Sequence, residues 1–292
     1  MTDTASPARR FRELLASDRL IEAPGAYDAI TARMVEHAGF PLVYMTGAGT
    51  ALSRGYPDYG LMTLTEMADN AGVLARSVSI PVLADADTGF GNELNVTRTV
   101  EEYESRGVAG LHLEDQVTPK RCGHLDGKEV VDRAEFVARI AAAVSARSSD
   151  DFVVVARTDA AATHGVDEAV ARANAALDVG ADVAFVEALT TTADVAAIPE
   201  RVHGPCLLNL VPGGKTPLAT RDEIAAMGYR IVIHPVMLLG TTTAAGDRAL
   251  VELAATGRHP EPGIPSIADF FVRFGGRRWD DLRRRFDARD RA

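Results

Sequence analysis

Short apolar runs alternate with longer segments of helical periodicity through most of the chain, and this alternation constrains the fold more than any other feature. Short runs rich in β-branched residues are typical of buried strands, and apolar residues three or four positions apart are typical of amphipathic helices. The run at 152–156 is apolar throughout, as expected of a parallel strand covered on both faces. Eight such runs are expected to form strands: Leu20–Ala23, Leu42–Thr46, Val82–Ala84, Gly110–Leu113, Phe152–Ala156, Val183–Val186, Cys206–Leu210 and Arg230–Ile233.

Helical segments fill the intervals between these runs, and several of them end at a glycine, which adopts the left-handed conformation of a helix C-cap at little cost. Helices are expected over Ala26–His37, Leu64–Ser77, Val96–Arg106, Arg133–Arg147, Val166–Val179 and Arg221–Met227. Repeated strand–helix units favour a closed (β/α)₈ barrel of the TIM type, which is an α/β fold with parallel strands. A doubly wound open sheet is the alternative.

The chain continues past the eighth unit. A long apolar helix is expected over Val236–Thr256, prolines at 260, 262 and 265 interrupt the pattern, and an amphipathic segment follows at Phe270–Arg285. We expect one barrel domain over residues 1–292, of which about 236–292 form a C-terminal helical extension. Because the extension is not needed to close a barrel, it packs either on a neighbouring subunit or over its own barrel.

Composition and charge exclude several classes of function. The formal net charge of −10 and the pI near 5.2 leave no basic surface for nucleic acid or for an anionic membrane. No apolar run approaches the roughly 20 residues that cross a bilayer, and the first residues lack the apolar core of a signal peptide. Two cysteines are too few for a disulfide framework. These features predict a cytoplasmic protein that binds neither nucleic acid nor membrane.

Polar residues stand at the carboxyl ends of the expected strands, where the active sites of such barrels lie. The strand interiors are apolar, whereas acids, a guanidinium and an amide follow them. The residues at these ends are Tyr44, Thr46, Asp85, Asp87, Glu114, Arg157, Glu187, Asn209 and His234. We expect them to converge on one rim of the barrel.

Three of these carboxylates indicate a metal site. Asp85 and Asp87 are one residue apart and would point the same way on a strand, and Glu114 follows the next strand. Carboxylates that close repel one another unless a cation neutralises them, and oxygen ligands suit Mg²⁺, with Mn²⁺ as an alternative. The other interpretation is that these acids cap helices or pair with arginine or lysine.

Cys122 lies in the polar segment Lys-Arg-Cys-Gly-His at 120–124. Cationic neighbours lower the pKa of a thiol and make it a usable acid, base or nucleophile. We therefore interpret Cys122 as catalytic, with an inert surface thiol as the alternative. Cys206 stands inside an apolar strand and is interpreted as core packing.

Two further elements of the rim indicate anion binding. The small residues at 46–49 offer a hydroxyl and backbone N–H groups to a carboxylate, or they form only a tight turn between strand and helix. Arg157, at the end of an apolar strand, requires an anionic partner, which is either a substrate oxyanion or Glu187.

Together, several segments resemble the isocitrate lyase / phosphoenolpyruvate mutase superfamily over a stretch from about Pro24 to about Met237. They are Tyr44-x-Thr-Gly-x-Gly49, Asp85-x-Asp-Thr-Gly-Phe-Gly91, Glu114-Asp-Gln-Val-x-Pro-Lys-Arg-Cys-Gly-His124, Ala156-Arg-Thr-Asp159 and Gly213-Gly-Lys-Thr-Pro217. The third segment is the most specific. The resemblance implies a (β/α)₈ barrel whose final helix is exchanged between subunits of a homodimer or homotetramer. It also implies Mg²⁺ and a small α-oxycarboxylate substrate.

The resemblance further implies a role for each matching residue. The metal would be held, largely through waters, by Asp85, Asp87 and Glu114, with a gating loop nearby that carries Asp58. The substrate would be bound at its carboxylate by Thr46, Gly47 and Ala48, at its oxyanion by Arg157, and elsewhere in the pocket by Gly123, His124, Glu187 and Asn209. The hydroxyl proton would pass to Tyr44 or a bound water, and Cys122 would protonate the enolate left after cleavage.

Differences from the family pattern narrow the expected reaction. The Lys-Arg-Cys-Gly-His loop looks like that of the carbon–carbon lyases, and the segment at 213–217 is similar to the branch containing 2,3-dimethylmalate lyase and petal-death type 2-alkylmalate lyase. Gly240 stands where relatives that hold a tricarboxylate place an arginine. The expected substrate is therefore a dicarboxylate such as a 2-alkylmalate or 2,3-dimethylmalate, cleaved into a 2-oxo acid and a carboxylic acid.

Other reactions stay open at the same site. They are methylisocitrate cleavage, oxaloacetate hydrolysis, and a phosphonomutase reaction of the carboxyphosphonoenolpyruvate or phosphoenolpyruvate type. An alternative of another class is a catalytically silent barrel that serves as a scaffold.

Overall fold

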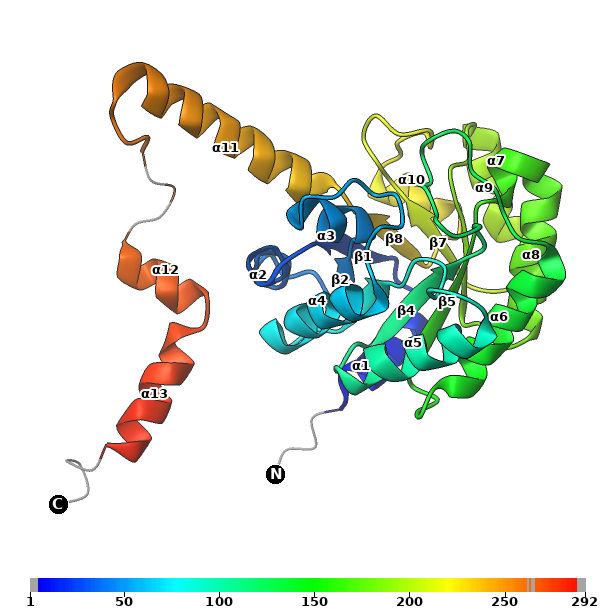
Figure 1. Cartoon of the computed structure of the whole chain (residues 1–292), viewed down its shortest axis with the longest axis horizontal. Helices are drawn as coiled ribbons and strands as arrows, with labels where there is room; N and C mark the ends of the chain where they lie inside the picture. The colour runs from blue at the N-terminus through cyan, green and yellow to red at the C-terminus, as the bar shows by residue number, and fades with distance from the viewer. Residues whose placement is uncertain (1–4, 262, 264–265, 288–292) are drawn as a thin grey trace. The chain divides into compact units, whose positions relative to one another are not determined.

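The computed structural model describes residues 5–261, 263 and 266–287, and its strands form a closed parallel barrel in chain order (Figure 1). The strands are β1 (Ile21–Ala26), β2 (Val43–Met45), β3 (Val82–Asp85), β4 (Gly110–Glu114), β5 (Val153–Thr158), β6 (Val183–Val186), β7 (Cys206–Asn209) and β8 (Ile231–His234). Each strand pairs with the next, and β8 pairs with β1 to close the barrel. The predicted (β/α)₈ architecture is confirmed.

Helices connect the strands and surround them. In this part of the chain they are α1 (Pro7–Ala16), α2 (Ala29–His37), α3 (Gly47–Ser53), α4 (Leu64–Ser77), α5 (Glu93–Ser105), α6 (Arg133–Ala146), α7 (Ala160–His164), α8 (Val166–Asp178), α9 (Thr192–Arg201) and α10 (Arg221–Ala226). The predicted start of α2 at Ala26 is wrong. The side chain of Asp28 accepts from the N–H of Thr31 and so fixes the start of the helix at Ala29.

Alternate residues of the strands point into the barrel and form a buried inner cluster. Tyr44, Val155, Phe185 and Ile233 belong to it, and α1 contributes Phe11. The same alternation continues to the carboxyl ends of the strands, where the inward side chains become polar. The packing of the inner cluster thus positions a ring of polar side chains at one end of the barrel.

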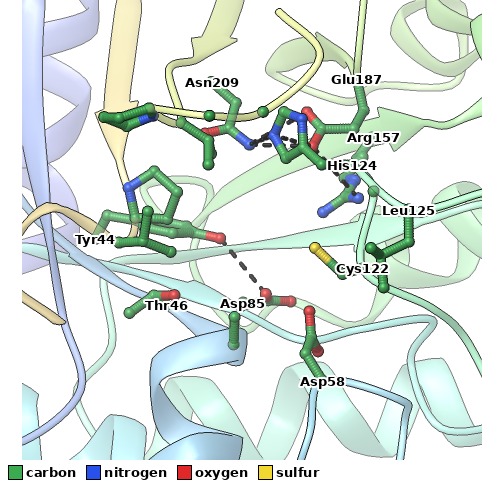
Figure 2. A pocket seen from close by; sticks show the side chains of 18 of the residues that line it. Tyr44, Thr46, Asp58, Asp85, Cys122, His124, Leu125, Arg157, Glu187 and Asn209 are labelled. Atoms are coloured by element: carbon green, nitrogen blue, oxygen red, sulfur yellow. Dashed lines mark hydrogen bonds and ion pairs between the residues drawn. The ribbon is translucent and has the colours of Figure 1, made fainter. Parts of the chain in front are cut away.

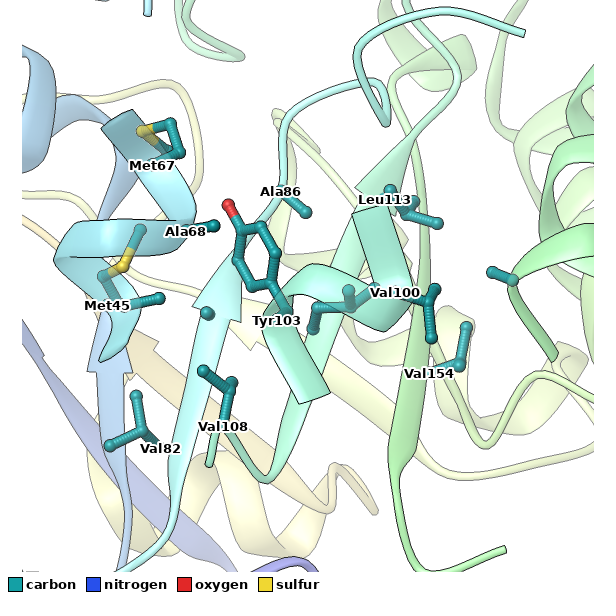
Figure 3. Packing of buried hydrophobic residues seen from close by; sticks show 14 of the residues in the cluster. Met45, Met67, Ala68, Val82, Ala86, Val100, Tyr103, Val108, Leu113 and Val154 are labelled. Carbon is teal, nitrogen blue, oxygen red and sulfur yellow. The ribbon is translucent and has the colours of Figure 1, made fainter. Parts of the chain in front are cut away.

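A second cluster lies between the strands and helices α4, α5 and α6 (Figure 3). Tyr103 of α5 is fully buried in it, together with Val82 and Val100. Burying a side chain of this size stabilises the fold by about 2–3 kcal/mol. The Tyr103 hydroxyl also donates a 2.9 Å hydrogen bond to the carbonyl of Asp85. Packing of α5 therefore helps to position the end of β3.

Several strands run further toward their carboxyl ends than predicted. β3 includes Asp85, β4 includes Glu114, and β5 extends through Arg157 to Thr158. Polar side chains interrupt the apolar pattern, yet the backbone pairing continues: Glu114 is in register with Arg157. These functional candidates therefore stand on the strands themselves, which hold them more rigidly than loops would.

By its contacts the chain divides into two compact units, Met1–Gly240 and Thr241–Ala292. Helices α11 (Met237–Thr256), α12 (Ile267–Arg273) and α13 (Gly276–Phe286) occupy the C-terminal part. The amphipathic segment expected over Phe270–Arg285 comprises parts of two helices, separated at Gly275, whose φ of 95° ends the helical conformation. Pro262 and Pro265 lie outside the described residues. The single-domain assignment and the exchange of the extension between subunits stay predictions.

No helix in the described ranges is long and apolar enough to span a membrane.

Candidate functional site

A cavity of about 210 Å³ opens at the carboxyl ends of the barrel strands (Figure 2). Its lining comprises Tyr44, Thr46, Ala48, Asp58, Asp85, Lys120, Cys122, Gly123, His124, Leu125, Arg157, Glu187, Asn209, Val211, Pro212, Gly213, Gly214, Pro235 and Val236. The structure thus brings together all of the predicted site residues except Gly47, Asp87 and Glu114. Each of these three contacts a lining residue. His234 of β8, also expected on this rim, is not part of the lining.

Three buried carboxylates lie at the ends of β3 and β4. Asp85 is held by the backbone: its Oδ2 accepts from the N–H of Gly47 at 3.1 Å and its Oδ1 from the N–H of Asp87 at 2.9 Å. Oε1 of Glu114 accepts no hydrogen bond from the described residues, whereas Oδ1 of Asp87 and Oε2 of Glu114 each lie in an ion pair, with Lys120 and with Arg157. Burial raises the pKa of Asp87 to about 6 and raises that of Glu114 well above its ordinary value. Such carboxylates are costly to ionise unless a cation neutralises them.

Lys120 supplies positive charge to this cluster and was not assigned a role from the sequence. Its ammonium lies 2.5 Å from Oδ1 of Asp58 and 2.9 Å from Oδ1 of Asp87. Burial alone would lower the pKa of Lys120, but the carboxylates of Asp87, Asp58 and Glu114 raise it well above its ordinary value. Its position two residues before Cys122 is the feature of the sequence that could have identified Lys120 as a site residue.

The donor set at β3 and β4 suits a hard divalent cation, because all of its atoms are oxygens. Among the residues that the structure describes, no three His, Cys, Asp or Glu side chains are arranged to bind a metal ion directly. Asp85, Asp87 and Glu114 therefore do not form a closed cage, and water would have to complete the coordination, as it commonly does for Mg²⁺. Oε1 of Glu114, which accepts no hydrogen bond from the described residues, fits such a group.

Cys122 lies on the loop between β4 and α6 and faces the cavity (Figure 2). Its cationic neighbours predict a lowered thiol pKa, and that prediction is wrong. Burial raises the pKa of Cys122; the N–H of His124 opposes this, Asp58 raises the pKa further, and Arg157 and Lys120 oppose it. The thiol is therefore protonated at neutral pH, which suits a proton donor better than a nucleophile.

Arg157 is buried at the end of β5 among three carboxylates. Its Nε donates to Oδ2 of Asp159 at 2.9 Å, its Nη1 lies 3.1 Å from Glu114, and its Nη2 lies 3.8 Å from Glu187. The guanidinium carbon also lies 5.2 Å from the centre of the Phe185 ring. Asp159 is thus the principal protein partner of Arg157, and Glu187 is the most distant of the three. Asp159 could have been predicted as this partner, because it follows Arg157 by two residues and residues two apart share one face of a strand.

Asp159 is expected to make the fold sensitive to acid. Burial opposes its ionisation, but Arg157 and Lys128 outweigh burial and lower the pKa of Asp159 to about 2. Because the unfolded value is about 3.9, the ionised carboxylate should stabilise the fold by about 2 kcal/mol above pH about 4 and lose that effect as the pH falls toward 2.

Denaturant unfolding of the wild type and Asp159→Asn across this pH range measures the contribution. The variant should be less stable at neutral pH, and the difference should shrink toward pH about 2. A difference that does not change with pH would contradict this assignment.

His124 forms a polar wall of the cavity with residues of β6 and β7. Its Nδ1 accepts from the backbone N–H of residue 215 at 3.1 Å, so Nε2 carries the proton and lies 3.3 Å from Oε1 of Glu187. The amide of Asn209 donates to the same Oε1 at 3.0 Å. Burial lowers the pKa of His124, which leaves its imidazole uncharged at neutral pH.

Tyr44 points from β2 into the cavity, with its hydroxyl 2.8 Å from Nε2 of His112 and 3.5 Å from Oδ2 of Asp85. His112 was not predicted; it is fully buried and stacks on the Tyr44 ring. Burial, with a further contribution from Asp85, raises the pKa of Tyr44 well above its ordinary value. Tyr44 is therefore a neutral phenol at neutral pH, suited to hydrogen bonding and weak as a base.

The small residues after β2 form the start of α3. Thr46 caps this helix by accepting from the N–H of Gly49 at 3.2 Å. A Cβ at Gly47 would lie only 2.3 Å from the Asp85 carboxylate, so the close approach of that carboxylate requires glycine. The predicted tight turn is present, and the Gly47 N–H is engaged by Asp85. Binding of a substrate carboxylate by Thr46, Gly47 and Ala48 stays a prediction.

The chain matches the family model described as phosphoenolpyruvate phosphomutase over residues 11–254. It is 47% identical to 2,3-dimethylmalate lyase of Eubacterium barkeri, over 82% of this chain and 83% of that protein. It is 48% identical to probable 2-methylisocitrate lyase 1 of Corynebacterium glutamicum, over 87% of this chain and 84% of that protein. Sequence identity alone therefore does not separate these two activities.

Solved structures show the same similarity. Oxaloacetate acetylhydrolase in complex with the inhibitor 3,3-difluorooxalacetate superposes with a TM-score of 0.93 at 42% identity, covering 96% of each chain. Phosphonopyruvate hydrolase in complex with oxalate and Mg²⁺ superposes with a TM-score of 0.87 at 31% identity, covering 97% of this chain and 99% of that one. Several different reactions are thus associated with this one fold.

Proposed function

Because the chain belongs to the phosphoenolpyruvate mutase/isocitrate lyase superfamily and is an enzyme of its carbon–carbon lyase branch, we propose that it cleaves a 2-alkylmalate or 2,3-dimethylmalate. The products are a 2-oxo acid and a carboxylic acid. The observation that carries the proposal is that the thiol of Cys122 and the guanidinium of Arg157 line the same cavity, and burial raises the pKa of that thiol. A retro-aldol cleavage needs this pair, a proton donor for the carbanion and a cation for the oxyanion.

The proposed reaction breaks the bond between C2 and C3 of the substrate. A base removes the proton of the C2 hydroxyl, the C2 oxygen becomes the ketone of the 2-oxo acid, and the bonding electron pair passes to C3 and its carboxylate. Cys122 then donates its proton to C3, and Arg157 stabilises the oxyanion. The high pKa of Tyr44 favours a water molecule as the base and Tyr44 as a hydrogen-bond donor.

We propose Mg²⁺ as the cofactor, held by Asp85, Asp87 and Glu114, with Mn²⁺ as the alternative. When bound, the ion would polarise the C2 oxygen and stabilise negative charge on it. Support comes from the oxygen-only donor set, in which Oε1 of Glu114 accepts no hydrogen bond from the described residues, and from the Mg²⁺ in the structure of phosphonopyruvate hydrolase.

Metal binding is expected to depend on these carboxylates. Asp87→Asn should weaken Mn²⁺ binding, followed by electron paramagnetic resonance, by about 10–100-fold, because it removes a charged oxygen ligand. Asp126→Asn, on an exposed side chain of the neighbouring loop, is the control and should leave the affinity unchanged. Equal affinity in the wild type and both variants would contradict the metal assignment.

The charges in the cavity favour a dicarboxylate over a tricarboxylate. In the described part of the lining, Lys120 and Arg157 are the permanently charged cations, and each already contacts carboxylates of the protein. Gly240 lies in α11, and it is not among the lining residues. A third substrate carboxylate would thus be desolvated without its own cation, at a cost of several kcal/mol.

A turnover screen with Mg²⁺ over 2-methylmalate, 2,3-dimethylmalate, methylisocitrate and oxaloacetate tests the proposal. We expect 2-oxo acid from one of the two alkylated malates, at a kcat/KM at least about tenfold above that for methylisocitrate. Oxalate release from oxaloacetate as the dominant reaction would favour a hydrolase, and the similarity to oxaloacetate acetylhydrolase makes this the second candidate. No turnover of any of the four compounds would favour a phosphonate as the substrate, and ³¹P NMR would then follow its conversion.

We also propose that the enzyme is a homodimer or homotetramer whose C-terminal part packs on another copy. In the single chain no residue of α11 is buried, and Leu250, Val251 and Trp279 are 65%, 69% and 67% exposed. Apolar side chains this exposed mark an interaction surface. Light scattering should give an oligomer for the wild type and a smaller species for Leu250→Asp/Val251→Asp. A monomeric wild type would contradict this.

A further inference from the structure

The loop that carries Cys122 is fastened by a buried lysine, Lys128. We define the cysteine loop as residues 117–129, which begin and end next to a backbone bridge between Gln116 and Val130. The ammonium of Lys128 donates to the carbonyl of Gly123 at 2.5 Å and to Oδ1 of Asp159 at 2.7 Å. Only 2% of its side chain is exposed. One cation thus ties the part of the loop next to Cys122 to the end of β5.

Gly123 closely approaches residues at the ends of β5 and β6. A Cβ on this residue would lie 2.4 Å from Nη2 of Arg157 and 2.6 Å from Glu187. The backbone between Cys122 and His124 is therefore in contact with the guanidinium. The Lys128 contact holds that backbone in place from the other side, through the Gly123 carbonyl.

Asp159 links this contact to Arg157. Its Oδ1 accepts from both Lys128 and Nη2 of Arg157, and its Oδ2 accepts from Nε of Arg157. Its backbone N–H is fixed in turn by Oδ1 of Asp115 at 2.8 Å, and Asp115 is paired with Arg172 of α8 at 3.1 Å. The carboxylate of Asp159 is thus a rigid, shared acceptor for the loop and for the proposed oxyanion-binding group.

We propose that Lys128 is a positioning residue that holds the thiol of Cys122 over the cavity and, through Asp159, couples the placement of the cysteine loop to the orientation of Arg157. This inference rests on the proposed roles of Cys122 and Arg157 in the lyase reaction. Lys128 touches neither the thiol nor the cavity; its effect passes through the Gly123 carbonyl and the Asp159 carboxylate.

The rate of cysteine alkylation tests the positioning role of Lys128 without any substrate. In Lys128→Met, which keeps an unbranched chain but no charge, the rate of Cys122 alkylation by iodoacetamide should rise about tenfold or more, because losing a charge-assisted hydrogen bond shifts the loop toward open states. Cys206 is the internal control. It is 1% exposed in β7, and burial raises its pKa to about 12, so it reacts only when the barrel opens. Peptide mass spectrometry follows both thiols.

Turnover gives the second readout. Lys128→Met should lower kcat by about tenfold or more with a smaller change in KM, since the proton donor is displaced while the remaining pocket persists. Arg133→Met, which removes an exposed ion pair with Glu168 at the start of α6, is the matched control and should match the wild type in both readouts. Cys122 alkylation and kcat both within about twofold of the wild type in Lys128→Met would overturn the proposal.

Misfolding of the variant and an incorrect proposed function can both be distinguished from an incorrect positioning role for Lys128. If Lys128→Met does not fold, Cys206 reacts as fast as Cys122, and Lys128→Gln then carries the same test, because its amide still donates to a carbonyl without the charge. If the proposed function is wrong, the wild type cleaves neither of the alkylated malates, whereas the difference in Cys122 alkylation between the wild type and the variant still decides the positioning role.

Discussion

Replacing Cys122 by serine is expected to lower kcat by about 10²–10⁴-fold, the range that a positioned general acid contributes. Serine keeps the size of the side chain, but its hydroxyl is a far weaker acid than a thiol. Because the proposed substrate contacts are made by other groups, chiefly Arg157, KM should change much less than kcat. Initial rates of 2-oxo acid formation at saturating Mg²⁺ measure both parameters.

The matched control is Cys206→Ala. This thiol is buried in β7, is not part of the cavity lining, and its removal should leave kcat unchanged. Full turnover in Cys122→Ser would refute the role of the thiol as proton donor. A group other than Cys122 would then have to protonate the carbanion.

Replacing Arg157 by methionine is expected to have the largest combined effect on activity and stability. Loss of the oxyanion partner should lower kcat/KM by about 10²–10³-fold. The variant also removes the cation paired with the buried Glu114 and one of the two cations that contact the buried Asp159, the other being Lys128, which should reduce the free energy of unfolding by about 3–5 kcal/mol. Steady-state kinetics and denaturant unfolding give the two quantities.

Arg201→Met provides the comparison for Arg157→Met. Arg201 pairs with the exposed Asp167 at 2.6 Å, and its loss should change stability by less than about 1 kcal/mol and leave activity intact. An Arg157→Met variant as stable and as active as Arg201→Met would contradict the assignment of Arg157 as a buried, charge-bearing member of the site.

Hydrophobic periodicity was sufficient to predict the barrel. Most of the strands are apolar runs covered on both faces, as at Val153–Ala156, and the single buried His112 within β4 does not obscure that pattern. The ends were less accurate, because Asp85 and Arg157 are polar residues that continue the backbone pairing. Their side chains face a cavity, and a pattern of burial in the sequence does not separate a cavity wall from a loop.

Site residues could be predicted where the side chain itself indicates the chemistry, without knowledge of its partners in the fold. Arg157 and Asp85 could be placed on one rim from their positions at strand ends, and Cys122 from its polar neighbours on the loop after β4. The thiol pKa was wrong because it depends on burial, which the charged neighbours of Cys122 in the sequence conceal. Lys128 was missed for a related reason: its partners are a backbone carbonyl and a carboxylate far along the chain, and only the folded loop brings them together.

The most direct test of the central claim is the cleavage of 2,3-dimethylmalate in deuterium oxide, followed by NMR. We expect pyruvate together with propionate that carries one solvent deuterium on the carbon next to its carboxylate, delivered by the exchanged thiol of Cys122, and formation of both products about 10²–10⁴-fold more slowly in Cys122→Ser. The absence of cleavage by the Mg²⁺-loaded wild type, or equally fast formation of the same products by Cys122→Ser, would contradict it.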